Sequence, residues 1–188
     1  MATSEIDVEI SKTSPASNTE GKECPIGRYI NEAEGKKIID IAATWVGTPY
    51  SMVGANSEKL KVGDCSGTTN KIYKEAGFPY PYQTTAAFVQ FANKTNIFRE
   101  INPDKTPMQI GDVLLWPGHM AIYAPFPDGD PRRNTGVKKG GVEKNNNMYT
   151  AFNAKKGTPY GPFNIETFRP DAYRVFRYYL FSKDTVCK

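Results

Sequence analysis

The chain has few of the residues that build metal sites. Its 188 residues include one histidine and three cysteines, and these are widely spaced along the sequence. Structural zinc sites use four Cys or His ligands, usually in closely spaced pairs, so we expect neither a metal site nor a cofactor. A single histidine has a second consequence: any imidazole chemistry in this protein must use His119.

Long runs of one residue class are also missing. No apolar stretch approaches the 18 residues of a membrane-spanning helix, so we expect no membrane span. No run of five or more Lys or Arg occurs, and the basic residues that give the formal net charge of +4 are scattered. Mild basicity favours anionic partners such as a cell-wall polymer, but this scattering argues against nucleic acid as a partner.

The N-terminus lacks the basic segment and apolar stretch of a secretory signal. This leaves three possibilities: a cytoplasmic protein, export by another route, or a signal already removed. Residues 1–23 are rich in Ser, Thr, Glu and Lys, which predicts a flexible leader. Residues 24–188 have the length and apolar content of a single domain with its own core.

Two of the three cysteines lie near the ends of the chain. A disulfide between Cys24 and Cys187 would tie these ends together and would indicate an oxidising compartment. Two unpaired thiols are the alternative.

The first half of the chain carries helical signals. Asn31 and Glu34 form a capping-box pattern that begins a helix, and this helix is predicted to end at Gly47. A second helix is expected to start at or just after Cys65 and to end at Gly77. A third helix is predicted over residues 84–93, where apolar residues recur on one face.

Strand signals follow in the second half. Residues 112–116 and 119–124 are predicted strands joined by a tight turn at Pro117 and Gly118. Residues 125–147 resemble a long loop, either the rim of a substrate groove or a solvated excursion. Residues 148–154 and 173–181 return to strand character. Helices first and strands afterwards predict an α+β domain with an antiparallel sheet.

Cys65 and His119 are the candidate reactive groups. Cys65 lies in Gly63-Asp64-Cys65-Ser66-Gly67, at the start of the second predicted helix. Unpaired N–H groups and the helix dipole stabilise a thiolate there, and the Cys65 N–H could bind an oxyanion. His119 could serve as the base. The alternative is structural: a small buried cysteine and a polar histidine at a sheet edge.

Four segments together carry a family resemblance. Gly47-Thr48-Pro49-Tyr50, the Asp64-Cys65-Ser66-Gly67 turn, residues 110–116 and residues 118–123 resemble, in order and spacing, the NlpC-type cell-wall cysteine peptidases. The resemblance covers residues 36 to about 155. It implies a papain-like fold, in which N-terminal helices pack on a central antiparallel sheet. It also implies cleavage of amide bonds in the peptide stems of peptidoglycan.

The resemblance assigns roles by position. Cys65 is implied as the nucleophile and His119 as the base, while Tyr50 lines the site and helps to hold the oxyanion. Asp64 and Ser66 flank the nucleophile, where this family contacts the substrate stem. Two alternatives stay open: Tyr50 as a core aromatic residue and Asp64 as a helix N-cap.

The chain departs from the family at the third catalytic position. The family orients the imidazole with a polar residue on the next strand, often His, Asn or Gln. Aligning residues 151–157 places Asn153 there, and a shift of three places Thr150 there instead. Asn153 is preferred because its amide carbonyl can accept the imidazole N–H and select the tautomer.

A compact domain without a signal also resembles amidase toxins delivered by type VI secretion. Such effectors act in the periplasm of a target bacterium, and an immunity protein inhibits them in the producer. Two other functions stay open. One is a catalytically silent peptidoglycan-binding module, and the other is an acyltransferase or deamidase on the same fold.

Overall fold

The computed structural model describes residues 27–138, 141–152 and 158–181. The predicted leader, Cys24, Cys187 and Asn153 lie outside these ranges, so the leader, the disulfide and the role of Asn153 stay predictions. The described helices are α1 (Glu32–Thr44), α2 (Cys65–Glu75), α3 (Thr85–Thr95) and α4 (Ile165–Phe168), with 3-10 turns η1 (Gly54–Asn56) and η2 (Pro131–Asn134). Within these ranges, no helix has the length and apolar content needed to cross a bilayer.

Seven strands form one sheet, and every pairing between them is antiparallel. They are β1 (Gly27–Tyr29), β2 (Phe98–Ile101), β3 (Val113–Trp116), β4 (His119–Tyr123), β7 (Met148–Thr150), β8 (Gly161–Phe163) and β9 (Arg174–Phe181). The order is β1-β9-β3-β4-β7-β8, with β2 also paired to β9. A separate hairpin joins β5 (Gly136–Lys138) to β6 (Gly141–Glu143). The predicted α+β class with an antiparallel sheet is therefore confirmed.

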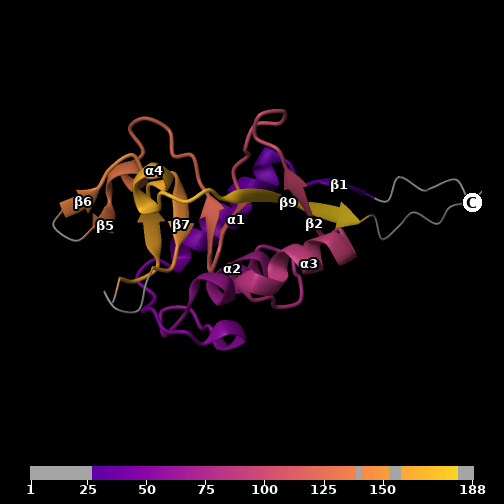
Figure 1. Cartoon of the computed structure of the whole chain (residues 1–188). Helices are drawn as coiled ribbons and strands as arrows, with labels where there is room; N and C mark the ends of the chain where they lie inside the picture. Colours follow the sequence, from indigo (N-terminus) through magenta and orange to yellow (C-terminus); the bar gives the residue numbers. More distant parts are fainter. Residues whose placement is uncertain (1–26, 139–140, 153–157, 182–188) are drawn as a thin grey trace, which may run out of the picture.

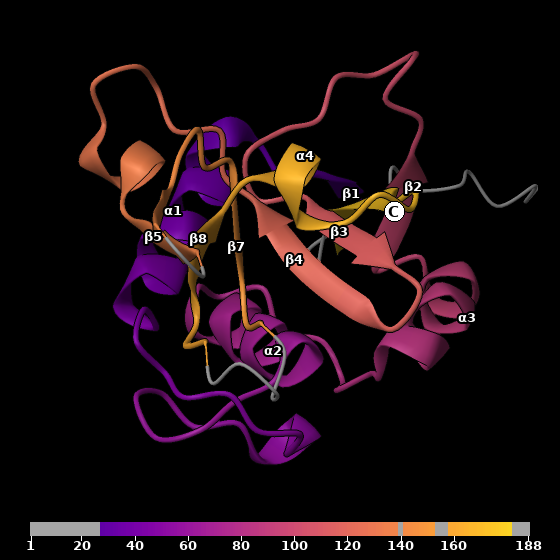
Figure 2. The ribbon, with the colours of Figure 1, turned by 60° about the vertical axis from the view of Figure 1, so that its left-hand side comes forward.

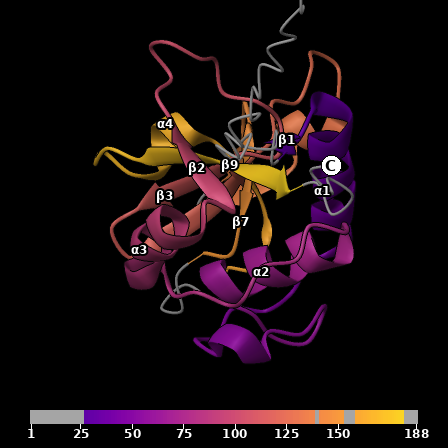
Figure 3. The same cartoon turned by 90° about the vertical axis from the view of Figure 1, so that its right-hand side faces the viewer.

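The sheet carries a core on each face. Val113, Leu115 and Met120 pack with the side chains of α1, α2 and α3. Leu114, Trp116 and Ala121 alternate with them along β3 and β4, and pack with Ile165 of α4 on the other face. Figures 1 and 3 show α2 and α3 on one side of the sheet and α4 on the opposite side. The period of two along a strand produces this division.

The strongest local signals are confirmed. Asn31 accepts the N–H of Glu34 at 2.9 Å, and the Glu34 carboxylate accepts the N–H of Asn31 at 2.8 Å, which completes the predicted capping box. Helix α1 ends at Thr44, three residues before the predicted Gly47. Helix α2 begins at Cys65, and Thr84 caps α3. The predicted strand over 148–154 is shorter in the structure and ends at Thr150.

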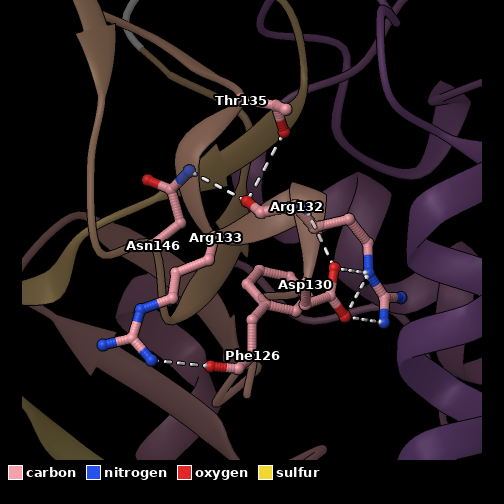
Figure 4. Close-up of polar contacts among 6 residues, drawn as sticks. All are labelled: Phe126, Asp130, Arg132, Arg133, Thr135 and Asn146. Carbon is pink, nitrogen blue, oxygen red and sulfur yellow. Dashed lines mark hydrogen bonds and ion pairs between the residues drawn. The ribbon is translucent and has the colours of Figure 1, made fainter. Parts of the chain in front are cut away.

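The loop predicted over residues 125–147 is wrong in part, because this segment contains η2, β5 and β6. Figure 4 shows the contacts that order its centre. The Asp130 carboxylate accepts bonds of 2.7–3.2 Å from the Arg132 guanidinium, and Asn146 donates from Nδ2 to the Arg132 carbonyl at 3.0 Å. Polar residues that are typical of loops here form hydrogen bonds with backbone groups and so order the segment. Amino-acid composition alone cannot show such ordering.

Candidate active site

Asp64 sets the start of the helix that carries Cys65. Its Oδ1 accepts the N–H of Gly67 at 2.7 Å, and its Oδ2 accepts the N–H of Gly54 at 2.6 Å. The first bond is an N-cap, and the second ties the η1 loop to the same carboxylate. The N-cap alternative for Asp64 is therefore confirmed, while contact with a substrate stays a prediction.

Gly67 permits this loop to approach the helix. A Cβ at position 67 would lie 2.1 Å from both the Gly54 carbonyl oxygen and Ser57 Oγ. The first of these atoms belongs to the backbone and cannot rotate away, so a larger residue would force η1 off the helix. The glycine that follows Asp64-Cys65-Ser66 is thus a packing requirement of this site.

The Cys65 thiol lies at the N-terminus of α2, with 8% of the residue exposed. Burial raises the pKa of this thiol to about 11, and the charge of Asp64 acts in the same direction. Backbone N–H groups of Met120, Ser66 and Cys65 itself oppose the rise in pKa, because each favours a thiolate. The thiol is therefore neutral at rest, with amides already directed at its sulfur.

The His119 imidazole is held by a threonine on the neighbouring strand. His119 Nε2 lies 2.8 Å from Thr150 Oγ1, which in turn donates to the Met120 carbonyl at 2.7 Å. Because the hydroxyl proton is used by Met120, Nε2 must supply the proton of the first bond. This assignment leaves Nδ1 unprotonated and able to act as a base.

Burial, and to a smaller extent the nearby Arg169, lowers the pKa of His119 to about 3, and Asp171 partly opposes this fall. The imidazole is therefore neutral at neutral pH, which is the form that can accept a proton. Only 8% of His119 is exposed. Burial therefore disfavours the charged form of both the Cys65 thiol and the His119 imidazole.

Met120 connects the two candidate reactive groups. Its N–H favours the Cys65 thiolate, and its carbonyl accepts the Thr150 hydroxyl proton. Helix α2 packs on β4 and touches β7, and Figure 2 shows α2 below these two strands. The described structure therefore brings His119 and Thr150 together, and the backbone of Met120 lies between this pair and Cys65.

The remaining predicted residues surround Cys65. Tyr50 pairs with Gly63 in an isolated bridge and is half-buried. Burial, and then the charges of Cys65 and Asp64, raise the pKa of Tyr50, so its hydroxyl is near both groups. Tyr50 also packs against the core, so the alternative of a core aromatic residue holds for the buried part of its side chain.

Ser66 is less available for a substrate than the sequence suggests. Its hydroxyl donates to Asp64 Oδ1 at 3.2 Å and lies 3.2 Å from the Tyr82 hydroxyl. Tyr82, which sequence reasoning missed, follows α2 in an alternating Pro-Tyr segment. The sequence signal for Tyr82 was this alternation, because each proline fixes its own backbone φ and so stiffens the connection that carries the tyrosines.

A mainly apolar cavity of about 550 Å³ adjoins the turn that carries His119. Ala86 and Val89 of α3 form one wall, and Trp116 and Gly118 of the β3–β4 turn form another. Gly118 has a φ of +73°, which favours glycine at this turn. The sequence offered no sign of this cavity, because its walls come from separate elements.

No protein-family model matches the chain, and no curated protein sequence matches it.

Proposed function

We propose that this protein is a cysteine amidase or peptidase that cleaves amide bonds in the peptide stems of peptidoglycan. One observation carries the proposal: a thiol at a helix N-terminus shares the backbone of Met120 with an imidazole bonded through Nε2. These are components that thiol hydrolysis requires, namely a nucleophile, a neutral base and oriented backbone N–H groups.

In the proposed reaction, His119 Nδ1 removes the proton from Cys65 Sγ as the sulfur attacks the amide carbonyl. The Cys65 backbone N–H stabilises the oxyanion of the tetrahedral intermediate, and the half-buried Tyr50 can contribute its hydroxyl. The imidazolium then protonates the departing amine, which leaves an acyl thioester on Cys65. His119 next deprotonates a water molecule that hydrolyses the thioester and regenerates the thiol.

Thr150 supplies the orienting contact in this proposal. Its hydroxyl bonds Nε2 and so selects the tautomer in which Nδ1 is the base. Asn153 was the first choice from the sequence and lies outside the described residues. Thr150 therefore takes the positioning role here, and the variants described below compare the two.

The substrate class rests on the motif resemblance. Residues 47–50, 64–67, 110–116 and 118–123 resemble NlpC-type enzymes, and the proposed fold is accordingly papain-like. The cavity beside the turn at Pro117 and Gly118 offers space for a segment of the stem. We further propose an antibacterial effector that acts in the periplasm of a target bacterium and is inhibited by an immunity protein in the producer.

Digestion of diaminopimelate-type peptidoglycan tests the proposal. Wild type and Cys65→Ala, both reduced and checked for folding by circular dichroism, are incubated with purified sacculi, and soluble fragments are identified by mass spectrometry. Fragments from wild type alone are expected, and their masses identify the bond. If folded wild type releases nothing, the proposal is overturned. A covalent adduct on Cys65 would then favour a transferase, and sacculus binding without an adduct a binding module.

Thr150→Val is expected to lower the rate of fragment release about tenfold, because valine keeps the shape and removes the bond to Nε2. Thr150→Ser keeps the hydroxyl and is expected to retain most of the rate. Initial rates of fragment release measure both variants. Asn153→Ala is the comparison: a large loss there, with Thr150→Val unaffected, would return the orienting role to Asn153.

A further inference from the structure

The ring of His119 is covered from the side of the sheet opposite α2. Helix α4 ends at Phe168, whose ring centroid lies 4.8 Å from that of the imidazole, with 40° between the ring planes. Trp116, which pairs with His119 across the β3–β4 ladder, has its ring centroid 6.0 Å from the imidazole. Two aromatic rings thus lie against the imidazole, and no local sequence pattern indicates the contact with Phe168.

An aromatic cluster holds Phe168 in this place. The ring centroids of Trp116, Phe152 and Phe163 lie 5.5, 5.0 and 6.0 Å from that of Phe168. Such ring pairs are stabilising beyond the burial of their surface. Phe168 is therefore a fixed neighbour of the imidazole.

The segment over residues 125–147 anchors the start of α4. Asn147 Oδ1 accepts the N–H of Ile165 at 2.9 Å, and Asn164 donates from Nδ2 to the Lys144 carbonyl at 3.1 Å. Asn147 also joins β4 to β8, because its carbonyl accepts the Ala124 N–H at 2.8 Å and its N–H donates to the Phe163 carbonyl at 2.9 Å. The end of the segment thus connects the strand of His119 to the helix that covers it.

We propose that Phe168 is a positioning residue, which covers the His119 ring, shields its bond to Thr150 from water and is held there by the Asn147 anchor. This inference rests on the proposed function for its catalytic meaning, because it specifies how the base of that site is kept oriented. It also gives the 125–147 segment a role, which is to support α4. Water admitted to this position would compete for Nε2 and let the ring turn.

Among the described residues, two charged groups act on the imidazole. Arg169 and Asp171 come from the connection between α4 and β9, and form an ion pair at 2.6 Å. Burial is the largest cause of the low pKa of His119. Removing the Phe168 ring should therefore raise that pKa toward its ordinary value while Arg169 and Asp171 stay in place.

NMR titration of the histidine tests the proposal without any assay of activity. Because the chain has one histidine, ring signals of ¹⁵N-histidine-labelled protein report His119 alone. In wild type we expect a neutral Nε2–H tautomer across the folded range down to about pH 4. In Phe168→Ala we expect protonation to begin at least about one pH unit higher, with mixed tautomers. Phe168→Leu, the matched apolar control, should stay close to wild type.

Asn147→Ala provides an independent variant, because it removes the anchor and keeps the Phe168 ring. We expect a smaller rise in the pKa of His119 in this variant. If Phe168→Ala fails to fold, Asn147→Ala tests the proposal in its place. Unchanged titration and tautomer in folded Phe168→Ala, or in Asn147→Ala where the former does not fold, would overturn the positioning role. A shifted titration in a protein that never cleaves peptidoglycan would instead overturn the proposed function alone.

Discussion

Replacing His119 with glutamine is expected to slow the release of peptidoglycan fragments by at least about 1000-fold. General base catalysis contributes about 10²–10⁴ in rate, and the chain has no second histidine to substitute for it. Glutamine can still donate a hydrogen bond toward Thr150, so the variant removes the titrating group while keeping a polar side chain of similar size. Initial rates from soluble fragment yields measure the effect.

Alkylation of Cys65 provides a second measurement on the same variant. Burial raises the pKa of the thiol to about 11, so few thiolates exist at neutral pH unless a base takes the proton. Iodoacetamide should therefore modify Cys65 more slowly in His119→Gln than in wild type at pH 7. The alkylation rates of the two proteins should approach each other as the pH rises toward 11. Equal fragment release by both proteins would contradict the assignment of His119 as the base.

Replacing Arg177 with methionine is expected to lower the free energy of unfolding by about 3–5 kcal/mol. Arg177 on β9 forms a two-pronged ion pair with Asp112, at 2.8 Å for both contacts, and the two side chains are 8% and 0% exposed. Arg177 also donates to the Pro107 carbonyl at 2.9 Å. Methionine would leave the Asp112 carboxylate buried without its cation, directly before the β3–β4 hairpin that carries His119. Urea unfolding at pH 7 measures the loss.

The sign of the pH dependence follows from Asp112. Burial raises the pKa of Asp112 even though Arg177 opposes the rise, so removing Arg177 should raise this pKa further. The folded variant then binds a proton at a higher pH than folded wild type does, while the unfolded value stays near 3.9 in both. The deficit relative to wild type should therefore shrink as the pH falls toward that value. A deficit that grows on acidification would contradict this account.

Arg174 on the same strand is the matched control. It forms an ion pair with Glu100 of similar geometry, at 2.6–2.7 Å, but the two side chains are 47% and 45% exposed. Solvent screens such a pair, so Arg174→Met should change the free energy of unfolding by at most about 1 kcal/mol. Similar losses of unfolding free energy in Arg174→Met and Arg177→Met would show that burial does not determine how much each ion pair contributes to stability.

Part of the fold and part of the site could be predicted because their sequence signals are local. The Asn31–Glu34 capping box, the start of α2 at Cys65 and the hairpin around Gly118 each depend on residues a few positions apart. Short-range hydrogen bonds and backbone preferences act within such windows. The sequence therefore also singled out Cys65 and His119, the two residues with the required chemistry.

Strands β1, β2 and β8 were missed for the opposite reason. Each has three or four residues and no clear alternation, and each becomes a strand by pairing with a distant partner. Strand β9 pairs with β2 along residues 175–178 and with β3 along residues 174–176, so it lies between them. Pairing of this kind depends on the whole chain.

By itself, the sequence determined the class of fold, the position of a cysteine at a helix start and the identity of the one possible imidazole base. Only the tertiary structure decided what surrounds that imidazole, which is Thr150 on β7 and Phe168 on α4. The reason is distance along the chain. These contacts join residues at least 31 positions apart, and their geometry is set by sheet pairing and packing, which no local pattern encodes.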